Sequence, residues 1–142
     1  MKVTLKRLDD AFHFEARNED GNTMQFDAGP NIGGHNKGVR PMQTLLMALG
    51  GCSAIDIISI LNKQRIALDD INIEIDGERE AGKEPSLFET IHVNYYLTGN
   101  ADAAKAKRAV DLSMEKYCSV AKTLEKTAQI TYSVFLNNEK IN

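Results

Sequence analysis

Two cysteines and one aspartate carry the clearest potential for chemistry in this sequence. Cys52 and Asp56 are four residues apart in the apolar segment TLLMALGGCSAIDIISIL, residues 44–61, and Cys118 comes later, in KYCSVAKTL. A thiolate is both a nucleophile and a redox group. In a reducing compartment a pair of cysteines is more often catalytic or redox-active than structural. A buried cysteine can equally be a small apolar core residue, and the residues alone leave both interpretations open.

The surroundings of Cys52 in the sequence do not explain how its thiolate would be stabilised. Cys52 lies about three turns past Pro41, where a helix is expected to begin, and the helix dipole acts mainly within the first turn. An activating cation must therefore come from elsewhere in the fold or from a partner subunit. Asp56, one turn beyond Cys52, would oppose a thiolate on the same side of the helix. We expect Asp56 to cap or pair with another polar group.

Short strands and two amphipathic helices are predicted to position these residues. Alternation of apolar and polar residues predicts three antiparallel strands at 2–8, 11–17 and 23–27, and the loop 29–38 contains four glycines. The same patterns predict a helix over 41–65, strands at 69–79 and 87–98, a helix from Asn100 or Asp102 to 117, a short helical piece at 120–125 and a strand at 130–136. No regular βα repeat is present, so the chain is predicted to be one α+β domain over residues 1–142.

Composition and charge argue against several classes of function. The net charge is −3 and the basic residues are scattered, which is not typical of a nucleic-acid-binding surface. The N-terminus lacks the apolar core of a signal peptide, so a cytoplasmic location is expected. The segment 44–61 is at the length threshold for a membrane span, but it contains Asp56, glycines and serines. We interpret it as a buried helix of a soluble protein, with no membrane partner.

No cofactor or metal is predicted from the motifs. The three histidines, His13, His35 and His92, lie on separate predicted elements, and two cysteines are too few for a structural zinc site. The glycines of GGHNKG lack the GK[ST] ending of a phosphate-binding loop. The residues thus predict a soluble α+β domain in which the two thiols form a candidate redox pair.

Two motifs resemble those of the OsmC/Ohr family of thiol peroxidases. The first is NIGGHNKGVRPMQTLLMALGGCSAIDI, residues 31–57, and the second is YCSVAKTL, residues 117–124. The segment LLMALGGCSAIDI is most similar to the less characterised OsmC-like branch of the family. The resemblance implies an OsmC-like fold, with antiparallel sheets wrapped around a long central helix. It also implies an intertwined homodimer in which two equivalent sites lie at the interface.

The resemblance further implies a two-cysteine peroxidase cycle in defence against oxidative stress. Cys52 would attack the peroxide and become a sulfenic acid, and Cys118 would then form a disulfide with it, which an external dithiol reduces. The apolar residues around Cys52 would suit organic hydroperoxides better than hydrogen peroxide. No cofactor is implied.

One departure from the family pattern concerns the activation of the thiolate. Active family members use an arginine to stabilise the thiolate and a glutamate to orient that arginine. Here the motif opens with Arg40-Pro41-Met42-Gln43, so Met42 or Gln43 occupies the glutamate position and cannot form a salt bridge. Arg40 and Arg17 are the candidate arginines, and weaker peroxidase activity is expected. The alternatives are a non-enzymatic dimer that acts as a redox sensor or small-molecule binding protein, and a protein whose thiols are only core residues.

Overall fold

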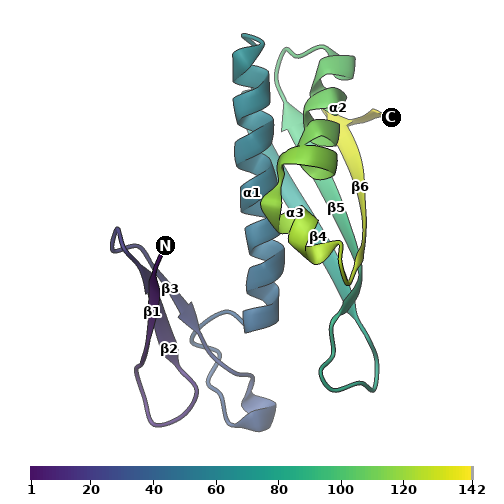
Figure 1. The fold of residues 1–142 in the computed structure, drawn as a ribbon. Coiled ribbons are helices and arrows are strands. Elements are labelled where there is room, and N and C mark those ends of the chain that lie inside the picture. Colours follow the sequence, from purple (N-terminus) through teal and green to yellow (C-terminus); the bar gives the residue numbers. More distant parts are fainter. Residues whose placement is uncertain (142) are drawn as a thin grey trace. The chain divides into compact units, whose positions relative to one another are not determined.

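The computed structural model describes residues 1–141 and divides into two compact units (Figure 1). One unit comprises Met1–Leu45, and the other begins at Leu46. Helix α1 (Pro41–Lys63) starts at the end of the first unit and continues into the second. That the whole chain forms one domain stays a prediction, and the two units are described separately below.

The N-terminal unit is built on a three-stranded antiparallel sheet. Strands β1 (Val3–Arg7), β2 (Phe14–Asn18) and β3 (Thr23–Phe26) pair in the order β1-β2-β3, as the alternation predicts. A short 3₁₀ helix, η1 (Pro30–Ile32), follows in the glycine-rich loop.

The buried carboxylate of Asp27 organises this loop. It accepts backbone N–H groups from Lys37 at 3.0 Å, His35 at 3.1 Å and Ala28 at 2.7 Å. These bonds, the one from Lys37 above all, hold the pKa of Asp27 below its usual range. The loop is therefore held by a charge-assisted network rather than by regular secondary structure.

The second unit combines a four-stranded sheet with three helical segments, which confirms the α+β class. Its strands are β4 (Asp70–Arg79), β5 (Phe88–Thr98), β6 (Gln129–Leu136) and β7 (Glu139–Ile141), paired in that order. Its helical segments, besides α1, are α2 (Ala103–Leu112), a π-helical turn η2 (Ser113–Tyr117) and α3 (Ser119–Leu124). Asp102 caps α2 by accepting the N–H of Lys105 at 3.0 Å, as one of the two predicted caps.

The strand arrangement corrects one expectation. The sheets were expected to be antiparallel throughout, but β5 and β6 are parallel, with Ile91 opposite Ile130. The chain between them carries α2, η2 and α3, which is long enough for the crossover that parallel neighbours require. Strand β7 was not predicted, because it is short and follows a tight turn formed by Asn137 and Asn138, both with positive φ.

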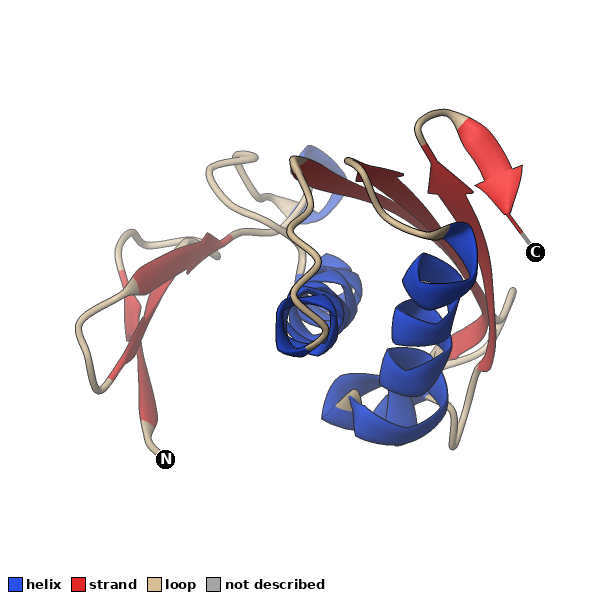
Figure 2. Ribbon diagram, turned by 90° about the horizontal axis from the view of Figure 1, so that it is seen from above, coloured by secondary structure: helices blue, strands red, loops and turns tan. Residues whose placement is uncertain are grey.

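Helix α1 and the α2–α3 segment pack on the same face of this sheet (Figure 2). Alternate residues of β5 point toward them, and α1 approaches β4 closely at Gly50, where a Cβ atom would lie 3.2 Å from Ile75 Cδ1. The core of this unit includes Leu49, Ile57 and Leu61 of α1, Ile91, Val93, Tyr95 and Leu97 of β5, and Ala106, Ala109 and Val110 of α2.

One side of α1 has little cover within the second unit. Ile55 is 70% exposed, and Met47 and Ile58 are also exposed. A Cβ atom at Gly51 would meet nothing within 4 Å, in contrast to the neighbouring Gly50. By length and composition α1 is apolar enough to cross a membrane, a test that core helices of soluble proteins also pass. The expectation that α1 is buried is thus met on its sheet-facing side only.

Candidate functional site

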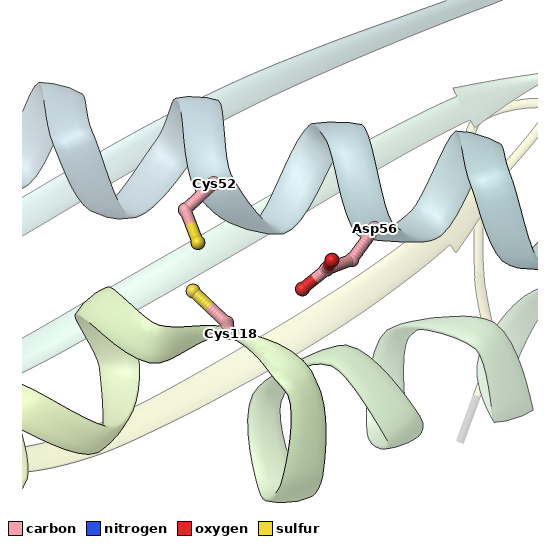
Figure 3. Close-up of side chains that lie close together, drawn as sticks. All are labelled: Cys52, Asp56 and Cys118. Atoms are coloured by element: carbon pink, nitrogen blue, oxygen red, sulfur yellow. The ribbon is translucent and has the colours of Figure 1, made fainter. Parts of the chain in front are cut away.

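Cys52, Asp56 and Cys118 converge in the second unit (Figure 3). Their sulfur, carboxylate oxygen and sulfur atoms all lie within 4.8 Å of one another, and both cysteines are free. Cys52 and Asp56 lie one turn apart on the same side of α1, because residues four apart share a helix face. Cys118 faces them from the junction between η2 and α3. Residues distant in the sequence therefore form one cluster of two thiols and a carboxylate.

The π-helical turn η2 positions two members of this arrangement. The N–H of Cys118 donates to the carbonyl of Ser113, five residues back, at 2.8 Å. The Ser113 hydroxyl, wholly buried, donates to Asp56 Oδ2 at 3.1 Å. This bond confirms that Asp56 pairs with another polar group. Single π turns in helices occur frequently at functional sites, and this one brings Ser113 to the carboxylate and Cys118 to Cys52.

The two thiols have different environments. Cys118 is wholly buried, whereas Cys52 is partly exposed. Burial raises the pKa of Cys118 to about 11, and the neighbouring Cys52 sulfur adds to this effect. The N–H of Ala121, which donates to Cys118 Sγ at 3.4 Å at the start of α3, acts in the opposite direction without cancelling it. Cys118 is therefore a protonated thiol at neutral pH.

Tyr95 is a buried polar neighbour of the cluster that sequence reasoning missed. Its hydroxyl donates to Met114 Sδ at 2.9 Å, and burial raises its pKa, an effect that the Ser53 hydroxyl partly offsets. Ser53 itself is buried and donates to the carbonyls of Leu49 and Gly50 at 2.8 and 3.1 Å. Both residues lie on faces that the pattern predicted as core, and neither belongs to a motif that would have distinguished it.

The predicted auxiliary residues Arg40 and Gln43 lie at the start of α1, in the N-terminal unit. Arg40 Nη1 donates to the carbonyls of Asp27 at 3.3 Å and Gly38 at 3.1 Å, and Nη2 donates to the Asn36 side chain. Gln43 Oε1 accepts the backbone N–H of Arg40 at 3.0 Å, which satisfies a donor at the helix N-terminus as in a capping box. Their roles in catalysis stay predictions.

Arg17, the other candidate arginine, lies on β2 and forms an ion pair with Glu15 at 2.9 Å. By contrast, Arg40 has no carboxylate partner among residues 1–141. Its charge is therefore not compensated by an acidic side chain within the described part of the chain.

The distance between the sulfur atoms suits thiol–disulfide chemistry. A disulfide bond requires about 2.05 Å between them, so the pair would have to close by less than 3 Å from its largest possible separation of 4.8 Å. Cys52 is the more accessible sulfur and Cys118 the enclosed one. The same donor set, two sulfurs and one carboxylate oxygen, also has the composition of a binding site for a thiophilic divalent cation.

Comparison with known proteins agrees with this description. The family model described as "OsmC-like protein" matches residues 34–133. Protein YhfA of Escherichia coli K12 is 50% identical over 100 residues, which cover 69% of this chain and 73% of YhfA.

Solved structures show the same fold. A hypothetical protein from Aquifex aeolicus superposes with a TM-score of 0.78 at 31% identity, over 96% of each chain. A Legionella pneumophila structure, titled an organic hydroperoxide resistance protein OsmC, superposes with a TM-score of 0.72 at 18% identity, over 95% of this chain and 97% of that one. At that identity, the second likeness establishes the fold alone.

Proposed function

Because the chain belongs to the OsmC-like family, we propose that it is a thiol-dependent peroxidase that reduces organic hydroperoxides in defence against oxidative stress. The observation that carries this proposal is the convergence of a partly exposed and a buried free cysteine, Cys52 and Cys118, within 4.8 Å. The hydroperoxide resistance named for the Legionella structure agrees with it. We expect the reaction in the reducing cytoplasm, where the thiols would be regenerated.

In the first step, the thiolate of Cys52 attacks the terminal oxygen of the hydroperoxide. The O–O bond breaks, Cys52 becomes a sulfenic acid, and the alkoxide takes up a proton and leaves as an alcohol. Cys52 is assigned this step because it is the more accessible of the two sulfurs. The raised pKa of Cys118, caused by burial, keeps that thiol protonated and makes it the weaker nucleophile.

In the second step, Cys118 attacks the sulfenic sulfur, a disulfide forms, and hydroxide leaves and takes the thiol proton to become water. An external dithiol then reduces the disulfide and is itself oxidised. Apolar side chains near Cys52 on α1 that are exposed, among them Leu45 and Met47, would favour organic over inorganic peroxide. Hydrogen peroxide is expected to be the poorer substrate.

We retain a homodimer as the functional assembly and Arg40 as the candidate cation for the Cys52 thiolate. Because about three turns of α1 separate Arg40 from Cys52 of the same chain, Arg40 would have to act from the partner subunit. Support for Arg40 comes from its place in the matched motif and from its lack of a carboxylate partner within residues 1–141. Support for the dimer comes from the apolar side of α1, where Ile55 is 70% exposed.

A second candidate function is a non-enzymatic OsmC-like dimer that acts as a redox sensor or small-molecule binding protein. The observation that favours it concerns Gln43, which stands at or next to the glutamate position of the family motif. Its side chain caps the helix by accepting the backbone N–H of Arg40, so no carboxylate from this position orients the Arg40 side chain. Such a protein would be oxidised once by peroxide and would not turn over.

Dithiol consumption separates these possibilities. Wild type, Cys52→Ser and Cys118→Ser are compared with cumene hydroperoxide and with hydrogen peroxide. A peroxidase gives many turnovers, faster with cumene hydroperoxide, and Cys52→Ser abolishes them. Oxidation of one equivalent per site in the wild type would instead establish the sensor, and no thiol oxidation would show that the cysteines are core residues.

The same assay tests the arginine. Arg40→Met is expected to lower kcat/KM about tenfold or more, because a positive charge at the thiolate is lost. Arg17→Met is the matched control, because Arg17 already pairs with Glu15. Equal losses in both variants, or a loss only in Arg17→Met, would exclude Arg40 from the role.

A further inference from the structure

We propose that the reduced protein binds one Zn²⁺ ion per chain through Cys52, Asp56 and Cys118, and that this ion holds both thiols in an inhibited state. The first observation is the composition of the cluster. Two sulfurs and one carboxylate oxygen lie within 4.8 Å of one another. The third donor, Asp56, is neither a cysteine nor a histidine, so the spacing of those residues did not indicate the site.

The dimensions of the cluster suit a small cation. With sides of at most 4.8 Å, the triangle of donor atoms would place an ion at its centre about 2.8 Å or less from each, against about 2.3 Å for Zn–S and 2.0–2.2 Å for Zn–O bonds. Side-chain movements of about half an ångström would therefore be sufficient. Three protein ligands would leave the fourth tetrahedral position open to water.

Charge also favours a cation at this place. Metal binding requires both cysteines as thiolates next to the Asp56 carboxylate. Among residues 1–141, Asp56 forms no ion pair with a lysine, arginine or histidine. A divalent ion would neutralise most of the three negative charges, and the soft sulfur donors select Zn²⁺ over Mg²⁺ or Ca²⁺.

The residues behind the donors are arranged to orient them. Ser113 Oγ donates to Asp56 Oδ2 at 3.1 Å, which restricts the orientation of the carboxylate. The N–H of Ala121 donates to Cys118 Sγ at 3.4 Å. Hydrogen bonds of this kind orient the side chains that bind the metal, and their removal typically lowers metal affinity 10- to 100-fold.

The inhibitory part of the inference rests on the proposed function. A sulfur bound to Zn²⁺ is not free to attack a peroxide. Conversely, a disulfide between Cys52 and Cys118 removes two of the three donors. Metal binding and oxidation are thus expected to exclude each other at this site.

The test is a titration of the reduced, chelator-treated protein with Zn²⁺ in competition with a chromophoric chelator, under anaerobic conditions and without peroxide. The wild type should bind one ion per chain. Asp56→Asn and Ser113→Ala should each weaken binding about 10- to 100-fold. Asp76→Asn, which alters an exposed aspartate of β4, is the matched control and should bind as the wild type does.

Two further measurements make the test decisive. Co²⁺ should give thiolate-to-metal charge-transfer absorption in the wild type, weakened in Cys52→Ser and in Cys118→Ser. Protein oxidised with diamide should bind neither metal. Wild-type affinity in Asp56→Asn would show a plain dithiol chelate and overturn the three-donor site, as would the absence of binding. Because these readouts need no turnover, they remain valid if the peroxidase proposal fails.

Inhibition is measured separately. If the protein turns over peroxide, Zn²⁺ should suppress turnover with a midpoint that follows its dissociation constant, and the chelator should restore it. Unchanged turnover at saturating Zn²⁺ would overturn the inhibitory role and leave the binding site intact.

Discussion

Cys118 and Cys52 are chemically identical side chains that the fold places in different environments. Cys118 is wholly buried at the start of α3, and Cys52 is partly exposed on α1. Burial disfavours a thiolate because the charge loses its hydration. In the proposed cycle, this difference in burial is the reason why Cys52 is assigned the attack on the peroxide and Cys118 the resolving step.

A pH dependence of stability follows from the buried thiol. Cys118 has a pKa of about 11 in the folded protein, against 9.0 for an ordinary thiol. Between these values the unfolded chain releases this proton and the folded chain retains it, so stability falls as the pH rises from 9 to 11. The loss attributable to Cys118 is on the order of 2 kcal/mol.

Urea unfolding of reduced wild type and Cys118→Ser across this pH range measures the effect. Above pH 9, the unfolding free energy of the wild type should fall progressively relative to that of Cys118→Ser. Cys52→Ser leaves the burial of Cys118 in place but removes the smaller contribution of the Cys52 sulfur, so it should keep most of the pH dependence of the wild type. A difference that stays constant with pH would show that Cys118 ionises normally in the folded state.

At the residue scale, local patterns in the sequence predicted the placement of Cys52 and Asp56 but not that of Cys118. The four-residue spacing of Cys52 and Asp56 on a helix was sufficient to place both on one side. The approach of Cys118 was expected from the family resemblance alone and not from any local pattern, because it depends on the π turn η2, in which the Cys118 N–H bonds to the carbonyl of Ser113. A regular helix over residues 100–117 was predicted instead, since no residue in SMEKY signals the change of hydrogen-bond register.

Among the elements, α1 depends on a close approach to β4. At Gly50 the helix backbone comes so near that a Cβ atom would lie 3.2 Å from Ile75 Cδ1 and 3.9 Å from Ile73 Cγ2. Gly50 is two residues before Cys52, so this contact sets the depth at which the thiol lies over the sheet. A larger side chain would lift this part of the helix away from β4.

Gly50→Val is expected to destabilise the protein by about 1–3 kcal/mol through overpacking. Because displacement of α1 also moves Cys52, the yield of disulfide after treatment with one equivalent of peroxide should fall. Ser59→Val, at an exposed position of α1, controls for the helix propensity of valine. If the two variants were equally stable in urea unfolding, the space between α1 and β4 at Gly50 would not restrict the size of the side chain there.

The order of elements was largely predictable from periodicity, but their pairing was not. Each long strand and helix lies within a few residues of its predicted bounds, because alternation and capping residues are local signals. The parallel pairing of β5 with β6 depends on the path of the chain through α2, η2 and α3, which no local pattern records.

For the molecule as a whole, the exposed apolar side of α1 is the feature that supports association with a second copy. Ile55 is 70% exposed, and Ile58 and Met47 accompany it on the same helix. An isolated helix face of this kind is costly in water, and association of two copies would bury it. The proposed homodimer is argued from this face and from family membership together.

Replacing Ile55 with a charged residue tests that assembly. Ile55→Glu should convert the dimer to a monomer in light scattering coupled to size-exclusion chromatography, since a buried carboxylate without a partner is strongly unfavourable. Leu87→Glu, at another exposed apolar position, is the control and should stay dimeric. A dimer that survives Ile55→Glu would show that another surface mediates association.

In the proposed cycle, the enclosure of Cys118 would also impose a direction on the reduction of the disulfide. Once a disulfide has formed, an incoming dithiol can reach only the sulfur of Cys52, because Cys118 is wholly buried. The mixed disulfide must then form on Cys52, and Cys118 must depart as the leaving group. With its pKa raised by burial to about 11, Cys118 is a poor leaving group. Reduction, rather than attack on the peroxide, is therefore expected to limit the cycle, and a reductant whose second thiol has been replaced should be retained covalently on Cys52 of the oxidised wild type.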